Sequence, residues 1–126
     1  MIALDSSSII AFCNGQSGKD VEATVYALEQ EQAVLPPVVL TEILSDPRLP
    51  KSISQIFLDL PLLQITPGFW ERTGSLRATL IDSNYRARLA DSLIAQICID
   101  NECPLITRDQ DFQAFTKFSS LKLLVE

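Results

Sequence analysis

Four acidic residues far apart in the chain, Asp5, Glu42, Asp91 and Asp109, lie beside apolar runs where their carboxylates could act together. Carboxylates that converge on one place repel one another unless a cation neutralises them. The chain has no histidine, which excludes imidazole-based general bases, Ser-His-Asp triads and imidazole-built zinc sites. A bound metal would be held mainly by oxygen, which favours Mg²⁺ or Mn²⁺. Such an ion activates water and stabilises charge on a phosphodiester, so these residues predict metal-assisted phosphodiester cleavage.

Each of these acids also has a purely structural interpretation. Asp5 follows an apolar run and could cap a helix, and Glu42 could lie on the solvated face of an amphipathic helix. Asp109 could belong to an ordinary turn, and Asp111 competes with it for any role. Asp91 is harder to explain in this way, because its helix is apolar on almost every side and an unpaired buried charge is strongly disfavoured. The case for a site depends on whether the acids meet.

Five short apolar runs predict β-strands, because each is too short for a buried helix and is bounded by turn or cap residues. Helical segments alternate with them, and the runs lack polar alternation, which favours a parallel sheet with helices on both faces. Open parallel sheets place ligands at the carboxyl ends of their strands, where two of the acids fall. The length fits a single domain, residues 1–126. The predicted strands are Met1–Leu4, Ala33–Leu35, Leu62–Thr66, Pro104–Thr107 and Leu121–Val125.

The predicted helices fill the intervals between these strands. Ser17–Asp20 resembles a capping box ahead of an amphipathic segment. Pro37 can begin a second helix, which the Asp46-Pro47 pair would stop. Gly68–Leu80 and Ala87–Asn101 predict two more helices, and the last of these carries the third acid.

The ordered set of motifs resembles the PIN domain family, and especially the VapC-type toxin ribonucleases of bacterial toxin–antitoxin pairs. The matching segments are Ile2–Ser7, Leu40–Leu44, Ala90–Ala95 and Pro104–Phe112, in the right order and over essentially the whole chain. The resemblance implies a single three-layer α/β domain with a five-stranded parallel sheet in the order 3-2-1-4-5, flanked by helices. It also implies a Mg²⁺- or Mn²⁺-dependent endoribonuclease with an RNA substrate, a cognate antitoxin and a homodimeric state.

By that resemblance, four acids surround the metal ion and two hydroxyl groups form hydrogen bonds within the site. The acids after the first strand and in the last helix are the surest expected ligands, and the other two act directly or through water. The acids are Asp5, Glu42, Asp91 and Asp109, the hydroxyl residues are Ser7 and Thr107, and the alternate fourth acid is Asp111.

The charge of the chain argues against a general nucleic-acid-binding surface. Ten Lys and Arg residues against sixteen Asp and Glu residues give a net charge of -6, which excludes a polybasic sheath. Arg86, Arg88 and Arg108 fall in the second half of the chain, where they could contact the RNA backbone or simply be solvated. We therefore expect weak RNA affinity and selectivity for a structured target.

Three other interpretations fit parts of the pattern. The domain could be a catalytically degenerate RNA- or protein-binding module whose acids only cap helices, or a DNA- or flap-directed nuclease on the same fold. Binding of a divalent ion separates the first from a nuclease, and RNA and DNA substrates separate the second. A phospho-acceptor receiver domain would need a lysine after the last strand, whereas Lys122 falls within a predicted strand.

Cysteine usage and hydropathy predict a cytoplasmic protein. Cys13, Cys98 and Cys103 are odd in number and form no CxxC motif, so we expect three buried thiols in a reducing compartment. The apolar runs are shorter than about 18 residues and broken by charge, so no membrane association is expected. The N-terminus lacks the basic and apolar regions of a signal peptide.

Overall fold

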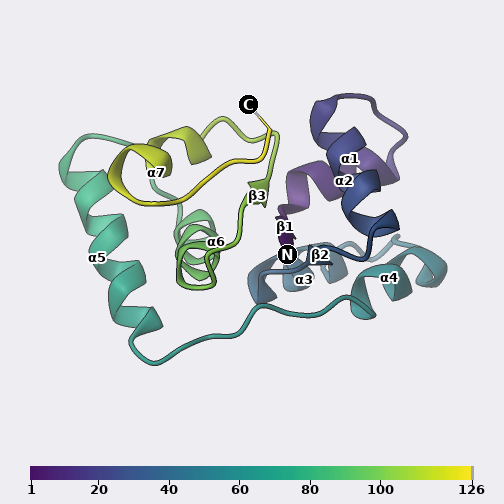
Figure 1. The fold of residues 1–126 in the computed structure, drawn as a ribbon, viewed down its shortest axis with the longest axis horizontal. Coiled ribbons are helices and arrows are strands. Elements are labelled where there is room, and N and C mark those ends of the chain that lie inside the picture. Colours follow the sequence, from purple (N-terminus) through teal and green to yellow (C-terminus); the bar gives the residue numbers. More distant parts are fainter. Residues whose placement is uncertain (126) are drawn as a thin grey trace.

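The computed structural model describes residues 1–125 and has a parallel sheet at its centre. Strands β1 (Ile2–Leu4), β2 (Ala33–Val34) and β3 (Leu105–Ile106) lie in the order β2-β1-β3 (Figure 1). The central strand β1 pairs in parallel with both neighbours. Because all three strands run in the same direction, their carboxyl ends share one edge, which confirms the predicted parallel arrangement.

The two outer strands of the predicted five-stranded sheet are each present only as a single parallel bridge. Leu62 pairs with Leu35 beside β2, and Leu123 pairs with Leu105 beside β3, both in parallel. The predicted order is kept, but the described residues form only three strands. Each predicted outer strand buries only one side chain fully, so longer pairing at these edges would cover little more apolar surface.

Seven helices surround the strands in the described part of the chain. They are α1 (Ser6–Cys13), α2 (Lys19–Glu29), α3 (Pro37–Leu44), α4 (Lys51–Leu58), α5 (Phe69–Asp82), α6 (Leu89–Asp100) and α7 (Phe112–Phe118). Helices α5, α6 and α7 lie together on one side of the strands, and α1 and α2 lie on the other (Figure 1). Helix α3 contacts both α1 and α6. Across residues 1–125, no helix combines the length and hydropathy needed to cross a lipid bilayer.

Local sequence signals predict the helices α3, α5 and α6 but not the start of α2. Pro37 is the first residue of α3, and the helices predicted at Gly68–Leu80 and Ala87–Asn101 are confirmed as α5 and α6. The capping box predicted at Ser17–Asp20 is wrong, because no side chain caps the start of α2. Asp20 is instead buried and bonded to other elements.

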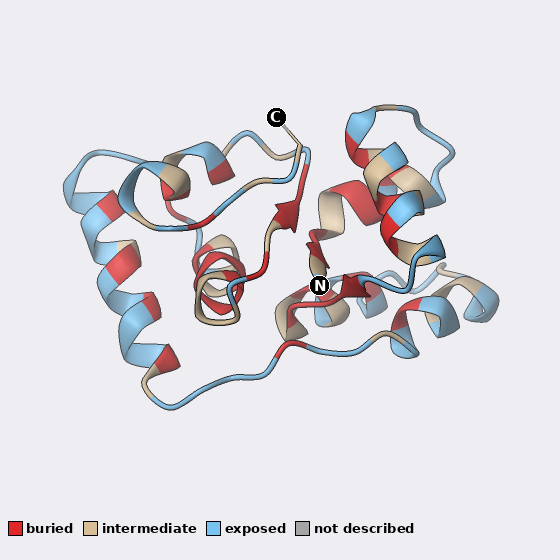
Figure 2. Cartoon of the chain, in the orientation of Figure 1, coloured by how far each residue is buried: buried red, intermediate tan, exposed pale blue. Residues whose placement is uncertain are grey.

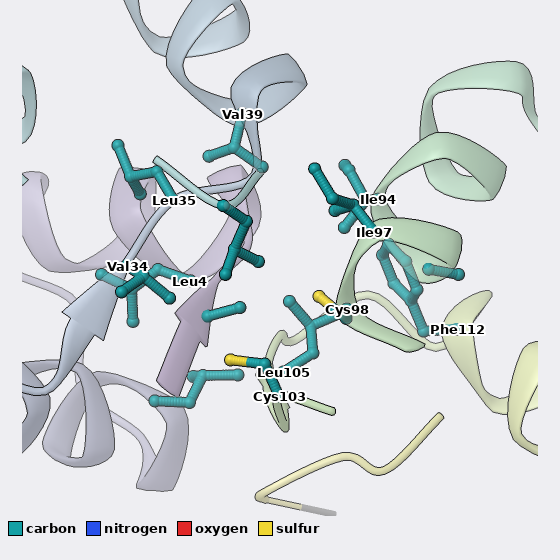
Figure 3. Packing of buried hydrophobic residues seen from close by; sticks show 14 of the residues in the cluster. Leu4, Val34, Leu35, Val39, Ile94, Ile97, Cys98, Cys103, Leu105 and Phe112 are labelled. Carbon is teal, nitrogen blue, oxygen red and sulfur yellow. The ribbon is translucent and has the colours of Figure 1, made fainter. Parts of the chain in front are cut away.

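The core lies on both sides of the short strands, where buried residues gather (Figure 2). Leu4 of β1 and Leu105 of β3 have no exposed surface. Ile94 and Ile97 of α6 and Phe112 of α7 belong to the same cluster (Figure 3). Burying each such side chain contributes about 1.5–3 kcal/mol. This core fixes the strand ends, so the polar residues that follow them have little freedom.

Two of the three cysteines behave as predicted. Cys98 and Cys103 are buried free thiols, whereas Cys13 is exposed, which corrects the predicted burial of all three. Cys13 is the last residue of α1, whose buried face ends at Ala11. The Cys13 side chain therefore lies beyond the core.

Candidate metal centre

Asp5 follows β1 directly and is held by hydroxyl groups from two parts of the chain. The residue is only 4% exposed. Its Oδ2 accepts a 2.6 Å hydrogen bond from Ser7 Oγ and a 2.8 Å hydrogen bond from Thr107 Oγ1. Asp5 occupies the N-cap position of α1, yet its carboxylate makes no capping hydrogen bond. Helix capping therefore does not explain this buried carboxylate.

Ser7 and Thr107 join the end of β1 to the end of β3. Their hydroxyl oxygens lie 3.2 Å apart, and both groups donate to the same oxygen of Asp5. The two hydroxyls also accept hydrogen bonds from the loop after β3. The Arg108 N–H donates to Ser7 Oγ at 3.2 Å, and the Asp109 N–H donates to Thr107 Oγ1 at 3.0 Å. The pair thus fixes the Asp5 carboxylate and the backbone that carries Asp109.

Asp91, Asp109 and Asp111 bring three carboxylates together between the start of α6 and the loop after β3. One carboxylate oxygen of each lies within 4.8 Å of the others. Asp91 Oδ2 is buried and has no hydrogen-bond partner among residues 1–125. The pKa of Asp91 is raised to about 6, chiefly by burial and then by the charges of Asp109, Asp5 and Asp111, against the opposing charge of Arg88. Such a carboxylate is destabilised unless a cation joins it.

Asp109 and Asp111 both belong to this cluster, although the sequence analysis treated them as alternatives for the fourth acid of the site. The Asp111 N–H donates a 2.9 Å hydrogen bond to Asp109 Oδ1. This contact tightens the loop after β3 just before α7, and both carboxylates then lie near Asp91. Spacing in the sequence could not separate the two residues, because both reach the same place.

Glu42 lies on α3, outside the group of three carboxylates, and the residue as a whole is exposed. Its pKa is raised chiefly by desolvation; a hydrogen bond with Ser6 opposes that effect and the charge of Asp5 adds to it. Helix α3 contacts α1, which begins at Ser6 directly after Asp5. The structure does not bring Glu42 into the cluster of Asp91, Asp109 and Asp111.

The three arginines predicted to contact RNA lie in two different environments. Arg86 and Arg88 are exposed in the loop before α6, and the charge of Arg88 acts on Asp91. Arg108 instead binds Asp20, with Nε and Nη2 donating to the two carboxylate oxygens at 2.8 and 3.0 Å. The sequence analysis missed the role of Asp20. It interpreted Asp20 as part of a capping box, and the partner of Asp20, Arg108, lies 88 residues away in the chain.

The acid cluster fits a hard divalent cation. Carboxylate oxygens are donors that Mg²⁺ and Mn²⁺ prefer. One of these oxygens has no partner among the described residues, and the neighbouring carboxylates repel it. The cluster contains neither thiol nor imidazole, so it does not suit the usual zinc or copper sites of proteins.

Fold and site together define an α/β domain that gathers acidic side chains at the carboxyl ends of parallel strands. The family model of the PIN domain matches residues 2–117, and the chain belongs to this family. Comparison with curated proteins finds no significant match.

Several solved structures resemble this chain over nearly its whole length. VapBC-5 from Mycobacterium tuberculosis, of the VapBC family of toxin–antitoxin systems, has a TM-score of 0.68 at 23% identity, covering 99% of this chain and 98% of that chain. VapBC2 from Rickettsia felis, solved with a DNA fragment from the VapBC2 promoter, has a TM-score of 0.72 at 19% identity and covers 98% and 97%. FitAcB from Neisseria gonorrhoeae has a TM-score of 0.68 at 19% identity and covers 98% and 96%. At these identities the likeness establishes the fold alone.

Proposed function

We propose that this protein is a Mg²⁺- or Mn²⁺-dependent endoribonuclease, the toxin of a VapBC-like toxin–antitoxin pair acting in the cytoplasm. One observation carries the proposal: Asp91 has a buried, unpartnered carboxylate oxygen beside the carboxylates of Asp109 and Asp111. This repulsion costs stability, and a domain that only bound RNA or protein would gain nothing from it. The likeness to VapBC structures supports the same class of function.

The proposed cation ligands come from four elements of the fold. Asp5, Asp91 and Asp109 hold the cation, and Asp111 and Glu42 act on it directly or through water. When bound, the cation supplies a polarised water molecule and neutralises charge on the phosphodiester. The chain contributes the placement of the carboxylates around it.

Other residues of the site orient these groups and the substrate. Ser7 and Thr107 hold the Asp5 carboxylate in one orientation through their hydrogen bonds to Oδ2. Arg86 and Arg88 offer positive charge to RNA phosphates beside the cluster. With a net charge of -6, the protein binds RNA weakly and selects a structured target.

Cleavage of matched RNA and DNA by the purified protein tests the activity. We expect Mg²⁺ or Mn²⁺ to support cleavage of the RNA and EDTA to abolish it. Asp91→Asn should slow cleavage by at least about 100-fold, because even residues one step removed from a metal contribute about 10- to 100-fold. Asp59→Asn makes the same charge change on an exposed residue beyond α4 and should cleave at the wild-type rate.

The other outcomes of this experiment separate the alternatives. Cleavage of DNA alone would favour a DNA-directed nuclease. Binding of RNA without cleavage of either substrate would favour a degenerate binding module. RNA cleavage that persists in EDTA would contradict the role of the cation.

We also propose a cognate antitoxin as a partner. The proposal is supported by the VapBC systems among the similar structures. Expression of the chain alone in a bacterial host should then arrest growth, and Asp91→Asn should relieve the arrest. Normal growth at confirmed expression of folded wild-type protein would contradict a toxin.

A homodimer is the proposed oligomeric state. It is supported by an exposed apolar surface on α5 and the start of α6, where Trp70, Ile81 and Leu89 are each at least half exposed. Trp70 and Leu93 border two hollows of about 180 and 410 Å³ on this surface. Light scattering should find a dimer that Trp70→Ser and Leu89→Ser weaken. A monomeric wild type at high protein concentration would contradict the proposal.

A further inference from the structure

Arg108 lies in the loop that carries Asp109, yet its side chain reaches the turn between α1 and α2. Nε and Nη2 bind both carboxylate oxygens of Asp20, at 2.8 and 3.0 Å. Nη1 donates to Gln16 Oε1 at 3.2 Å, and Nη2 also donates to the Ser17 carbonyl at 3.0 Å. All three guanidinium nitrogens are therefore engaged within the protein, a fork geometry that arginine supplies and lysine does not.

Asp20 is a buried anchor for this guanidinium group. The residue is 7% exposed, and Ser8 Oγ of α1 donates a 2.9 Å hydrogen bond to its Oδ2. Hydrogen bonding to Arg108 holds the pKa of Asp20 below its usual value, against the opposing effect of burial. Asp20 thus joins α1, α2 and the loop after β3 through one ionised carboxylate.

Gly18 leaves the space that the ion pair occupies. A Cβ atom at Gly18 would lie 2.7 Å from Asp20 Oδ1 and 3.0 Å from Arg108 Nη2. The φ angle of Gly18 is +147°, which residues with a side chain rarely adopt. Any larger residue at this position would therefore push the pair apart without changing a charge.

The loop after β3 is held from two sides. On one side, the Arg108 N–H donates to Ser7 Oγ and the Asp109 N–H donates to Thr107 Oγ1. On the other side, the Arg108 guanidinium is fixed to Asp20. The two backbone hydrogen bonds hold the loop after β3 close to the end of β1. The ion pair keeps the same loop from moving away from α1 and α2.

We propose that the Arg108–Asp20 ion pair is a positioning device for the cation site, which keeps Asp109 and Asp111 where their carboxylates meet Asp91. The inference rests on the proposed metal-dependent function. It gives Arg108 a role within the protein in place of the RNA contact that the sequence suggested. Arg108 and Asp20 act on the cation only through the loop after β3.

The direction of the change in cation affinity separates positioning from simple electrostatics. Arg108→Met removes a positive charge near the acids, so electrostatics alone would tighten Mn²⁺ binding. Loss of positioning instead weakens it by about 10- to 100-fold. Asp20→Asn and Gly18→Ala should weaken it in the same range. The Arg108→Met/Asp20→Asn double variant should bind no more weakly than the weaker single variant, because both remove one interaction.

Calorimetric titration of the full chain with Mn²⁺ measures these affinities, with circular dichroism showing that each variant is folded. Asp20→Asn is nearly isosteric and disturbs the fold least, whereas Gly18→Ala keeps every charge but strains the backbone at φ +147°. Arg72→Met and Asp100→Asn are the matched controls. Arg72 and Asp100 form a similar ion pair, 2.6 Å between Nη2 and Oδ2, at the far end of α6. These controls should bind Mn²⁺ with wild-type affinity.

Each outcome decides a separate question. Folded Arg108→Met and Asp20→Asn proteins that bind Mn²⁺ as tightly as the wild type would overturn the positioning role and leave the proposed function standing. A wild type that binds no Mn²⁺ would overturn the proposed function and this inference with it. If Arg108→Met binds Mn²⁺ as tightly as the wild type but lowers the salt dependence of RNA binding by about one phosphate contact, Arg108 belongs to the RNA interface and the positioning role is wrong.

Discussion

Thr107 Oγ1 donates a 2.8 Å hydrogen bond to Asp5 Oδ2 across 102 residues of sequence. Thr107 follows β3 and Asp5 follows β1, and these strands are neighbours in the sheet. The bond therefore ties together the two strand ends from which the acid cluster extends. Its charged acceptor and its burial make it one of the stronger polar contacts available to the site.

Thr107→Val tests this link directly, since valine has nearly the same shape and lacks the hydroxyl group. We expect a loss of about 1.5–3 kcal/mol in the free energy of unfolding, because a buried carboxylate loses a donor. Urea unfolding measures the change. Thr79→Val removes an exposed hydroxyl on α5 that donates only to a backbone carbonyl, so it should change stability by less than about 0.5 kcal/mol. Equal effects of the two variants would contradict the account.

Asp91→Asn should stabilise the metal-free protein while removing its function. A pKa raised from 3.8 to about 6 corresponds to about 3 kcal/mol without solvent screening. Partial exposure reduces this, so we expect a gain of about 1–2 kcal/mol. Urea unfolding in EDTA measures it. A loss of stability in this variant would show that Asp91 has a favourable partner without a cation.

Two kinds of carboxyl group give the stability opposite pH dependences. The raised pKa of Asp91 means that the folded state holds its proton more tightly, so this contribution falls as pH rises from about 3.8 to about 6. Asp20 and Asp100 have pKa values lowered by Arg108 and Arg72. Their contribution is present above the usual 3.8 and is lost as pH falls through the lowered values.

Unfolding free energies of the wild type and Asp91→Asn in EDTA, from about pH 2 to about pH 8, separate the two effects. The advantage of Asp91→Asn should grow up to about pH 6 and stay constant above it. The acid-side loss should be the same in both proteins, because both keep Asp20 and Asp100. An advantage that does not change with pH would contradict the raised pKa of Asp91.

Arg86→Gln and Arg88→Gln should weaken RNA binding with a smaller dependence on salt. Each removes one exposed positive charge from the loop before α6, and each lost phosphate contact should lower the slope of log K against log salt by about 0.7. Filter binding of RNA to metal-free protein measures the slope. Arg48→Gln removes an exposed arginine between α3 and α4 and is the charge-matched control. An identical slope for all three variants would show that no phosphate lies at Arg86 or Arg88.

Much of the fold follows from local patterns in the sequence. The inner strands are short, wholly apolar runs, and α6 has a nearly continuous apolar surface, so both are readable without tertiary information. The two outer strands cannot be predicted in this way, because their pairing depends on how many side chains become buried at the edges of the sheet. The segments around Leu62 and Leu123 resemble strands in their sequence, but each forms only a single bridge in the structure.

The acid cluster was partly predictable for a similar reason. Asp109 follows a strand, and Asp91 interrupts an apolar helix, and parallel topology brings both to one edge. The joint role of Asp111 depends on the turn of the loop after β3, which spacing does not specify. The role of Asp20 could not be predicted from the sequence, because it depends on an ion pair with Arg108, 88 residues away in the chain.

Binding of Mn²⁺ to the metal-free protein, followed by titration calorimetry, tests the existence of the acid site most directly. The wild type and Asp59→Asn should show saturable binding with the same affinity. Asp91→Asn should bind at least about 100-fold more weakly, because it removes the unpartnered carboxylate oxygen. No saturable binding by the wild type, or equal affinity for Asp91→Asn, would contradict the account.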